Sequence, residues 1–201
     1  MVEEKVRNRL PAASRRAQII QVAAKLFETS SYQETSMEAI AQRVGIRKAS
    51  LYYYFEGKDD LLAEMHLGTI EPIIDAHQRR LESGDLDPQE LLLAMMTDMV
   101  SVTETHPGHM RGIFEHFQEL PETVRAKIIE QRDRYRGSLL DVLDRGRAEG
   151  LFVIGDSNLT SMAILGMCSW TYHWFRPAGQ HSAAQIAKYF YDTLINGIGV
   201  A

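Results

Sequence analysis

A run of hydrogen-bond donors and flat rings lies between residues 47 and 54 of this chain. Its members are Arg47, Lys48, Ser50, Tyr52, Tyr53 and Tyr54. Arginine and lysine can donate hydrogen bonds to guanine edges or phosphates, and a ring can lie against a thymine methyl group. Serine and tyrosine hydroxyls commonly bind phosphate oxygens. This combination favours contact with double-stranded DNA.

The alternative for this run is an ordinary helical hairpin with a solvated charged face. Three tyrosines in succession argue against it. Successive residues of a helix point about 100° apart, so three adjacent rings are hard to bury on one side. We therefore expect the rings to face outward.

Two short helices should position these side chains. Thr35 and Glu38 have the spacing of a capping box, which would start the first helix. An apolar stripe at helical spacing follows, made of Met37, Ile40, Ala41 and Val44. Gly45 is expected to end that helix in a left-handed conformation. A second helix is then predicted over 47–53, with Leu51 on its buried side. This is the organisation of a helix-turn-helix, whose second helix enters the DNA major groove.

The stretch from Ser14 to about Gly68 resembles the DNA-binding domain of TetR/AcrR-type transcriptional regulators. The matching segments are RRAQIIQVAAKLF, TSMEAIAQRVGIRKASLYYYF and KDDLL. The resemblance implies that the phosphate-binding residues are Ser36, Tyr53, Tyr54 and Lys58. It implies that the residues facing the bases are Arg47, Lys48, Ala49, Ser50 and Tyr52. The family often has serine or threonine in place of Arg47, so Arg47 is expected to add a contact peculiar to this chain.

The net charge of −5 is divided unevenly along the 201 residues. Residues 1–60 carry 10 Lys and Arg against 8 Asp and Glu, whereas residues 61–201 carry 12 against 19. The acidity therefore lies away from the expected DNA-binding face. We expect binding to rely on a local patch, on neutral hydroxyl donors and on helix N-termini.

Composition favours a cytoplasmic regulator without membrane segments. No run of about 18 apolar residues is present, which excludes a membrane-spanning helix. The first residues, MVEEKVRNRL, lack the apolar centre of a signal peptide, and we expect a flexible arm over 1–13. The one cysteine, Cys168, cannot form an internal disulfide and is expected to be a small buried hydrophobe.

The whole chain is predicted to be all-α, with a helix-turn-helix domain over 14–60 and a larger helical domain over 61–201. Beyond the first domain we expect helices over 58–81, 88–106, 107–118, 121–149, 156–175 and 182–198. Pro72 is expected to kink the first of these helices. Pro121 is expected in the first turn of its helix, and Gly150 should close that helix.

The last two helices are the candidates for a homodimer interface. Two DNA half-sites one helical turn apart require a twofold dimer. Apolar residues on the penultimate helix include Ala163, Leu165, Gly166, Met167, Trp170 and Trp174. Those on the last helix include Ala187, Phe190, Tyr191, Leu194 and Ile195. The alternative is that these stripes build only the core of a monomer.

The larger domain also contains methionines and aromatic residues of the kind that line adaptable cavities. We expect the ligand-binding residues to be Met95, Met99, Phe114, Phe117, Tyr135, Trp170 and Trp174. An ordinary packed core is the alternative. The segment WTYHWFRPAGQHSAAQIAKYF at 170–190 resembles the C-terminal region of TetR-type regulators that respond to acyl-CoA thioesters. The resemblance implies an acyl-CoA or similar amphipathic effector. Its phosphates could be attracted by Arg125, Lys127, Arg132, Arg134 and Arg136; the alternative is that these charges form a solvated helix face.

Other functions are weaker. GDSNL at 155–159 superficially resembles a lipase nucleophile motif, but Asn158 departs from it, and Asp156 or Ser157 is explained as a helix N-cap. His106, His109 and His116 could suggest a metal site, but Pro107 interrupts their spacing. We expect no catalytic residues, no metal and no cofactor. A TetR-type regulator of efflux or drug response, or a DNA-binding protein without an effector, remain as alternatives.

The family resemblance also implies a mechanism. An effector in the second domain would move the helix that begins at Lys58, so that the two reading helices separate or swing out of register with the grooves. The effector must then bind the released shape more tightly than the DNA-bound one.

Overall fold

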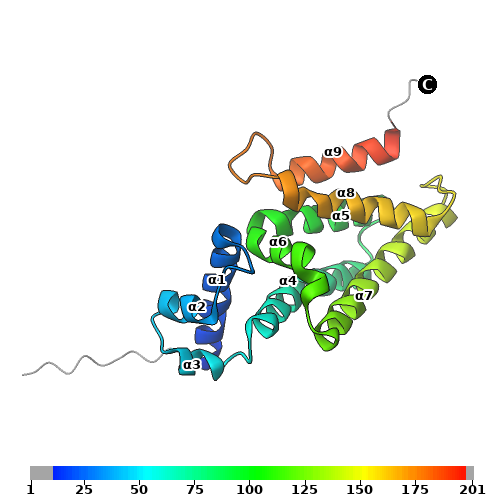
Figure 1. Ribbon diagram of the computed structural model, residues 1–201. Coiled ribbons are helices and arrows are strands. Elements are labelled where there is room, and N and C mark those ends of the chain that lie inside the picture. The colour runs from blue at the N-terminus through cyan, green and yellow to red at the C-terminus, as the bar shows by residue number, and fades with distance from the viewer. Residues whose placement is uncertain (1–10, 198–201) are drawn as a thin grey trace, which may run out of the picture.

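The computed structural model describes residues 11–197, and over that range the chain is helical with no strand. The helices are α1 (Ala12–Ser30), α2 (Met37–Val44), α3 (Lys48–Tyr52), α4 (Lys58–Ser83), α5 (Pro88–Thr105), α6 (Pro107–His116), the 3₁₀ turn η1 (Phe117–Glu119), α7 (Glu122–Ala148), α8 (Ser157–Trp174) and α9 (Ala183–Asn196). The all-α prediction is confirmed. Figure 1 shows α3 at one end of the molecule and α8 and α9 at the opposite end.

Two helix starts differ from the sequence-based expectation. α1 begins at Ala12, so residues 12 and 13 belong to a helix rather than to the arm, and the rest of the arm up to residue 10 lies outside the described residues. Pro121 is the N-cap of α7 and not a residue of its first turn. Proline still suits the position directly before a helix for two reasons. Its φ angle is fixed, and it has no N–H that would be left unpaired.

The predicted capping box at Thr35 is wrong by one residue. Ser36 is the N-cap of α2, and its hydroxyl accepts a hydrogen bond of 3.1 Å from the Ala39 N–H. Thr35 is buried, and its hydroxyl donates to the carbonyl of Ser31 at 2.7 Å. Ser31 has a positive φ of 60°, and the chain turns back after it, so the threonine hydroxyl is occupied inside the turn.

The first core joins α1, α2 and α3 to the start of α4 and continues beyond it. Buried residues of α1 to α3 pack with Leu61, Leu62 and Met65 of α4, and with Ile113 of α6. Helix α6 lies close to α4 at Gly112, where an added Cβ would lie 3.0 Å from a methyl carbon of Leu62 and 4.0 Å from the Phe27 ring of α1. The first core therefore continues beyond residue 60, and the helix-turn-helix part packs directly against α4 and α6.

The second core surrounds α5, which packs against α7, α8 and α9. Two hydrogen bonds join polar groups inside it: the Tyr135 hydroxyl donates to the Met95 carbonyl at 3.1 Å, and the hydroxyls of Thr103 and Thr171 are 3.0 Å apart. Cys168 is fully buried there, and burial raises the pKa of its thiol to about 12. The expectation that Cys168 is a small buried residue is confirmed.

α4 links the two cores. It continues as one helix through Pro72 and ends at Gly84, which has a left-handed φ of 69°. Its first turns pack in the first core, and its later residues Ile70, Ile73 and Ile74 pack in the second. Within residues 11–197, no helix combines the length and the apolar character that crossing a membrane requires.

Candidate nucleic-acid interface and ligand cavity

The turn between α2 and α3 has the geometry that the sequence predicts. Gly45 has a φ of 78°, a left-handed conformation that L side chains rarely adopt. The N–H groups of Gly45 and Ile46 donate to the carbonyls of Gln42 and Ala41 at 3.1 and 3.0 Å, which closes the end of α2. Leu51 is fully buried beneath α3. The turn and this anchor together fix the direction of α3.

The outward face of α3 is accessible. Its exposed residues are Arg47, Lys48, Ala49, Ser50, Tyr52 and Tyr53. Tyr53 is 83% exposed and Tyr52 is 47% exposed, which is unusual for side chains with so much apolar surface. Large exposed rings beside cationic and hydroxyl groups match a surface that binds a nucleic acid rather than a protein interior.

Tyr54 differs from its two neighbours. It is half-buried against the first core, and its ring meets the Tyr53 ring edge-on with centroids 5.3 Å apart. The Arg16 guanidinium donates to the Tyr54 carbonyl at 2.5 Å and lies 4.3 Å from the centre of the Phe55 ring. Arg16 also pairs with Glu64 of α4. The end of α3 is therefore tied to α1 and α4 at the same point.

Ser36 and Lys58 flank α3 and have intramolecular roles. Ser36 is exposed and caps α2, as described above. The Lys58 ammonium donates to the carbonyls of Tyr32 and Gln33 at 2.7 and 3.3 Å and lies 4.3 Å from the centre of the Tyr32 ring. Lys58 thus fastens the first turn of α4 to the loop before α2. Nearby, Lys48 pairs with Glu38 at 3.4 Å across the helix-turn-helix.

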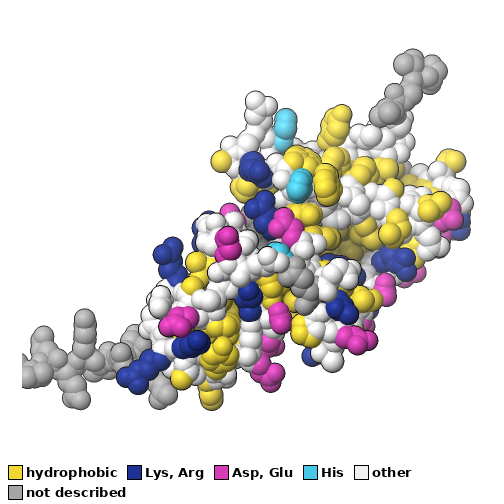
Figure 2. All heavy atoms as spheres, in the orientation of Figure 1, with side chains coloured by type: hydrophobic (Ala, Val, Ile, Leu, Met, Phe, Trp, Pro, Cys, Tyr) yellow, Lys and Arg dark blue, Asp and Glu magenta, His cyan; other side chains and the backbone are white. Residues whose placement is uncertain are grey.

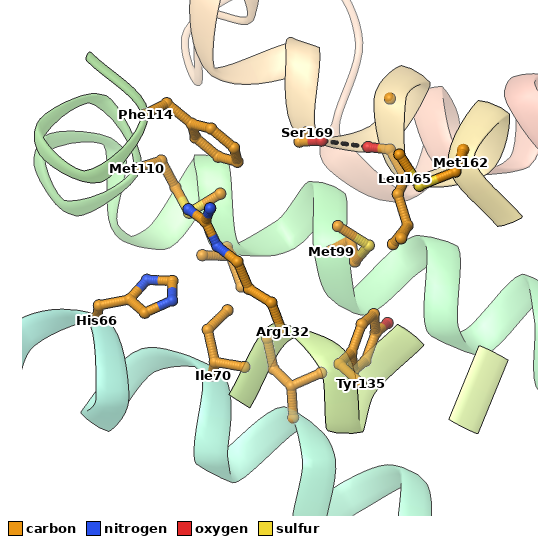
Figure 3. Close-up of a pocket in the computed structure, with 13 residues that line it drawn as sticks. His66, Ile70, Met99, Met110, Phe114, Arg132, Tyr135, Met162, Leu165 and Ser169 are labelled. Carbon is orange, nitrogen blue, oxygen red and sulfur yellow. Dashed lines mark hydrogen bonds between the residues drawn. The ribbon is translucent and has the colours of Figure 1, made fainter. Parts of the chain in front are cut away.

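A cavity of about 340 Å³ lies between α4, α5, α6, α7 and α8. Its lining comprises His66, Ile70, Ile73, Met99, Val102, Met110, Phe114, Arg132, Tyr135, Met162, Leu165, Gly166 and Ser169. Figure 3 shows side chains from all five helices converging on this space, with the Arg132 side chain extending through its centre towards Met110 and Phe114. Its volume falls within the roughly 300–1,000 Å³ that is typical of small-molecule sites.

Two polar groups stand out against the apolar lining. The Nη2 atom of Arg132 and the Nε2 atom of His66 are buried without a hydrogen-bond partner among the described residues. The pKa of His66 is lowered to about 3, first by burial and then by the nearby Arg132 and His109. Burial also lowers the pKa of Arg132 from its usual value. The cavity therefore combines one cation with a neutral imidazole.

Three of the seven residues expected to bind a ligand line this cavity, namely Met99, Phe114 and Tyr135. Met95 is buried in the second core and stands outside the lining. Phe117 lies beside the cavity, with its ring centre 4.8 Å from the Arg132 guanidinium carbon.

Trp170 and Trp174, the other two expected ligand residues, are 57% and 45% exposed on α8. They belong to an exposed stripe on that helix, together with Leu159, Met162, Ala163 and Gly166. Figure 2 shows hydrophobic side chains gathered along α8 on this face of the molecule. Helix α9, whose Phe190 ring centre lies 6.5 Å from that of Trp174, also exposes Tyr189 and Ile195. Large exposed apolar patches are typical of interaction sites.

His66 had no predicted role, and Arg132 was predicted only as one of five cations that could attract the phosphates of the effector. His66, Ile70 and Ile73 share one face of α4 at spacings of four and three residues. That spacing could have suggested a common surface. The position of the cavity on that face depends on how α4 packs against α7, which no local pattern encodes.

The GDSNL segment has a structural role. The Asp156 carboxylate accepts a hydrogen bond from the Leu159 N–H and so caps α8, as expected. The Ser157 hydroxyl donates to Asp144 at 2.6 Å and is buried. This serine hydroxyl is thus held by a carboxylate rather than by a histidine base.

The histidines of α6 are likewise engaged in the fold. His106 Nδ1 lies 2.7 Å from the Thr105 hydroxyl, and His109 Nδ1 lies 2.8 Å from the Thr69 hydroxyl. The His116 ring packs 5.1 Å from the Tyr32 ring. Over the described part of the chain, no group of three His, Cys, Asp or Glu side chains is placed to hold a metal ion.

Comparison with known proteins places both parts of the chain in one family. Residues 19–65 match the family model described as bacterial regulatory proteins, tetR family, and residues 85–198 match the model described as tetracyclin repressor-like, C-terminal domain. The HTH-type transcriptional repressor KstR2 of Mycobacterium tuberculosis is 26% identical over 187 residues, which cover 92% of this chain and 93% of that protein.

Solved structures agree with this placement. The TetR family transcriptional regulator PfmR from Thermus thermophilus is 32% identical and superimposes with a TM-score of 0.84, covering 90% of this chain and 99% of that one. AibR in complex with isovaleryl coenzyme A and operator DNA is 26% identical with a TM-score of 0.74, covering 90% and 98%. This chain belongs to the TetR family of ligand-responsive, DNA-binding transcriptional regulators.

Proposed function

We propose that this chain is a homodimeric repressor that acts in the cytoplasm and leaves its operator when an amphipathic molecule occupies the cavity between α4 and α8. The observation that carries the proposal is that one helix, α4, is fastened at its start to the DNA-reading part and lines the cavity farther along. A molecule that changes the position of α4 must therefore also act on α3.

The DNA-binding role rests on α3. The position and exposure of α3 allow it to enter a major groove. Its outward residues are the rings of Tyr52 and Tyr53 and the donors Arg47, Lys48 and Ser50. Arg47 and Lys48 supply charge, whereas the hydroxyls bind phosphate without changing the charge of the surface. Ala49 leaves room for the helix to approach the base edges. Ser36, Tyr54 and Lys58 are proposed to contact flanking phosphates.

The dimer is proposed to form through α8 and α9. The exposed stripe on α8 includes the small residues Ala163 and Gly166, which permit close approach, followed along the helix by the large rings of Trp170 and Trp174. Two reading helices must be held about one helical turn of DNA apart, at roughly 34–36 Å. α8 and α9 lie at the opposite end from α3 (Figure 1), so pairing through them leaves both reading helices free.

Coupling between the two sites is proposed to pass through α4. Lys58 holds the first turn of α4 to the loop before α2, and Glu64 binds Arg16 of α1. Two and six residues beyond Glu64, His66 and Ile70 line the cavity. An occupant that fits a shifted α4 better than the present one favours the released state by its difference in affinity for the two states.

The effector is proposed to be an acyl-CoA or a similar amphipathic molecule. The structural similarity to AibR, which was solved with isovaleryl coenzyme A and operator DNA, supports this class. The cavity volume of about 340 Å³ suits an acyl group, and the bulky nucleotide would then lie outside it. Its lining is mainly apolar, as an acyl body requires.

Fluorescence anisotropy with a fluorescent operator, selected from a random duplex library, tests this function. We expect binding of one dimer per operator and release by at least one CoA thioester in a panel of short, medium and branched acyl chains. Release by hydrophobic drugs and not by thioesters would instead identify a regulator of the drug-response type. A protein that binds operator but is neither released nor thermally stabilised by any of these molecules would be a DNA-binding protein without this effector class.

A further inference from the structure

The Arg132 guanidinium projects into the cavity, and the described residues offer it no counterion there. Its Nη2 atom is buried and has no hydrogen-bond partner among residues 11–197, and none of the described residues that line the cavity is Asp or Glu. Other arginines of α7 are paired differently: Arg134 binds Glu71 at 3.1 Å, and Arg125 donates to the Leu120 carbonyl at 2.7 Å. Arg132 is partly buried, and a guanidinium N–H that is buried without an acceptor lowers the stability of the folded protein. A residue that lowers stability in this way is expected to serve another purpose, such as binding an anion.

Aromatic rings compensate only part of this cost. The guanidinium carbon of Arg132 lies 5.2 Å from the ring centre of Phe114 and 4.8 Å from that of Phe117. Ring faces attract a cation, but they accept no strong hydrogen bond from its N–H groups. The two rings hold the guanidinium in place while its Nη2 donor remains free for an acceptor.

His66 supplies a second unpartnered group on the same cavity. Its side chain is only 4% exposed, and its Nε2 atom has no hydrogen-bond partner among the described residues. Burial and the proximity of Arg132 lower the pKa of this imidazole to about 3, so it is neutral at neutral pH. The cavity thus holds a single positive charge and one neutral nitrogen that can form a hydrogen bond. Figure 3 shows the His66 ring beside the lower part of the cavity, with the Arg132 side chain next to it.

We infer that the effector carries a carboxylate at the end that enters the cavity, and that Arg132 binds this carboxylate with His66 as the second polar contact. A carboxylate matches the single charge and the planar fork of a guanidinium. The rest of the effector lies against the apolar side chains of Ile70, Met99 and Met110. This inference rests on the proposed function, because it takes the cavity to be the effector site. A free carboxylic acid and an acyl-CoA whose acyl group ends in a carboxylate share this chemistry.

Isothermal titration calorimetry with the dimer tests the inference. The probes are straight-chain acids from hexanoate to dodecanoate, the alcohols of the same lengths, and CoA thioesters with and without a terminal carboxylate on the acyl group. We expect at least one carboxylate probe to bind about tenfold or more tightly than its uncharged counterpart. A preference among the free acids would point to a free acid as effector, and a preference only among the thioesters would point to a carboxyacyl-CoA.

The Arg132→Met variant keeps much of the length of the side chain and removes its charge. We expect it to lose the preference for carboxylates, to keep its affinity for the alcohols, and to melt at the same or a higher temperature than the unliganded wild type. Arg134→Met is the matched control, because Arg134 lies on the same helix, is exposed and pairs with Glu71. It should bind all probes as the wild type does.

Two results separate failure of this inference from failure of the proposed function. If uncharged probes or plain acyl-CoA thioesters bind as tightly as the carboxylate probes and release the operator, the carboxylate inference is refuted while the effector role of the cavity stands. If no probe binds and none releases the operator, both are refuted. A marked loss of thermal stability in Arg132→Met that no probe reverses would show Arg132 to be a structural residue and would also overturn the inference.

Discussion

The phenol hydroxyl of Tyr53 offers a sharp test of the reading helix. Tyr53 is 83% exposed, and its ring contact with Tyr54 would be kept by phenylalanine. The substitution Tyr53→Phe therefore removes one hydroxyl from the surface and should leave the free energy of unfolding unchanged. Because the free protein loses nothing, any loss of operator affinity measures a contact made only with DNA.

The expected magnitude follows from the number of lost contacts. A hydrogen bond from a hydroxyl to a charged phosphate contributes about 1.5–3 kcal/mol. A dimer on a palindromic operator loses two such bonds, or about 3–6 kcal/mol, which corresponds to roughly 10²–10⁴-fold weaker binding. Tyrosine is neutral, so the slope of log affinity against log salt concentration should stay the same, because no counterion release is lost.

Fluorescence anisotropy at several salt concentrations measures both quantities. Ser83→Ala is the control, since it also removes one exposed hydroxyl, lies at the far end of α4 from α3, and should bind operator as the wild type does. Wild-type affinity in Tyr53→Phe would refute the proposed phosphate contact of Tyr53. An equal loss in both variants would show that the effect does not come from the reading helix.

Three further predictions concern folding and assembly. First, the neutral imidazoles of His66 and His109 have pKa values lowered from 6.5 to about 3 and 4, while the unfolded chain takes up protons near 6.5. The free energy of unfolding should therefore be highest above pH 6.5 and fall by roughly 1.4 kcal/mol per pH unit for each histidine as the pH drops towards 4. Urea unfolding from pH 7.5 to 4.5 measures this free energy, and a value that does not change with pH would contradict the prediction. Second, Ser36→Ala should destabilise the protein by about 1 kcal/mol through loss of the α2 cap, detectable as a lower melting temperature. Third, Trp170→Glu should convert the dimer into a folded monomer in light scattering with an unchanged helical circular dichroism spectrum; a persistent dimer would argue against pairing through α8.

Local sequence determined the helix-turn-helix well because its signals are short-range. Gly45 has the left-handed conformation expected of it, and Leu51 is buried where the spacing put it. The sequence predicts Thr35 as the N-cap of α2, whereas Ser36 is the N-cap. Both residue types can cap a helix, and the turn at Ser31 engages the Thr35 hydroxyl and so leaves Ser36 to cap. Tyr54 is half-buried because a rotation of about 100° from Tyr53 turns it towards α1.

The cavity was only partly predictable. Met95 and Met99 are one helical turn apart on α5, yet only Met99 reaches the cavity, while Met95 lies in the packed core. Trp170 was expected to be a cavity wall and instead lies on the exposed face of α8. Arg132 has the same residue type as its exposed neighbour Arg134, and only the packing of α7 against its neighbouring helices distinguishes them. Residue type indicates what can line a cavity, but long-range packing selects which residues do.

The separation of the two reading helices is the most direct measure of the whole account. Glu56→Cys, at an exposed position between α3 and α4 and outside the proposed DNA contacts, can be spin-labelled selectively, because Cys168 is fully buried and burial raises the pKa of its thiol. Electron–electron resonance on the labelled dimer should give one narrow distance near the groove spacing of about 34–36 Å when operator is bound. A molecule that releases the operator should shift or broaden that distance. The absence of any distance between subunits, or a distance unaffected by that molecule, would contradict an effector-driven movement of α3.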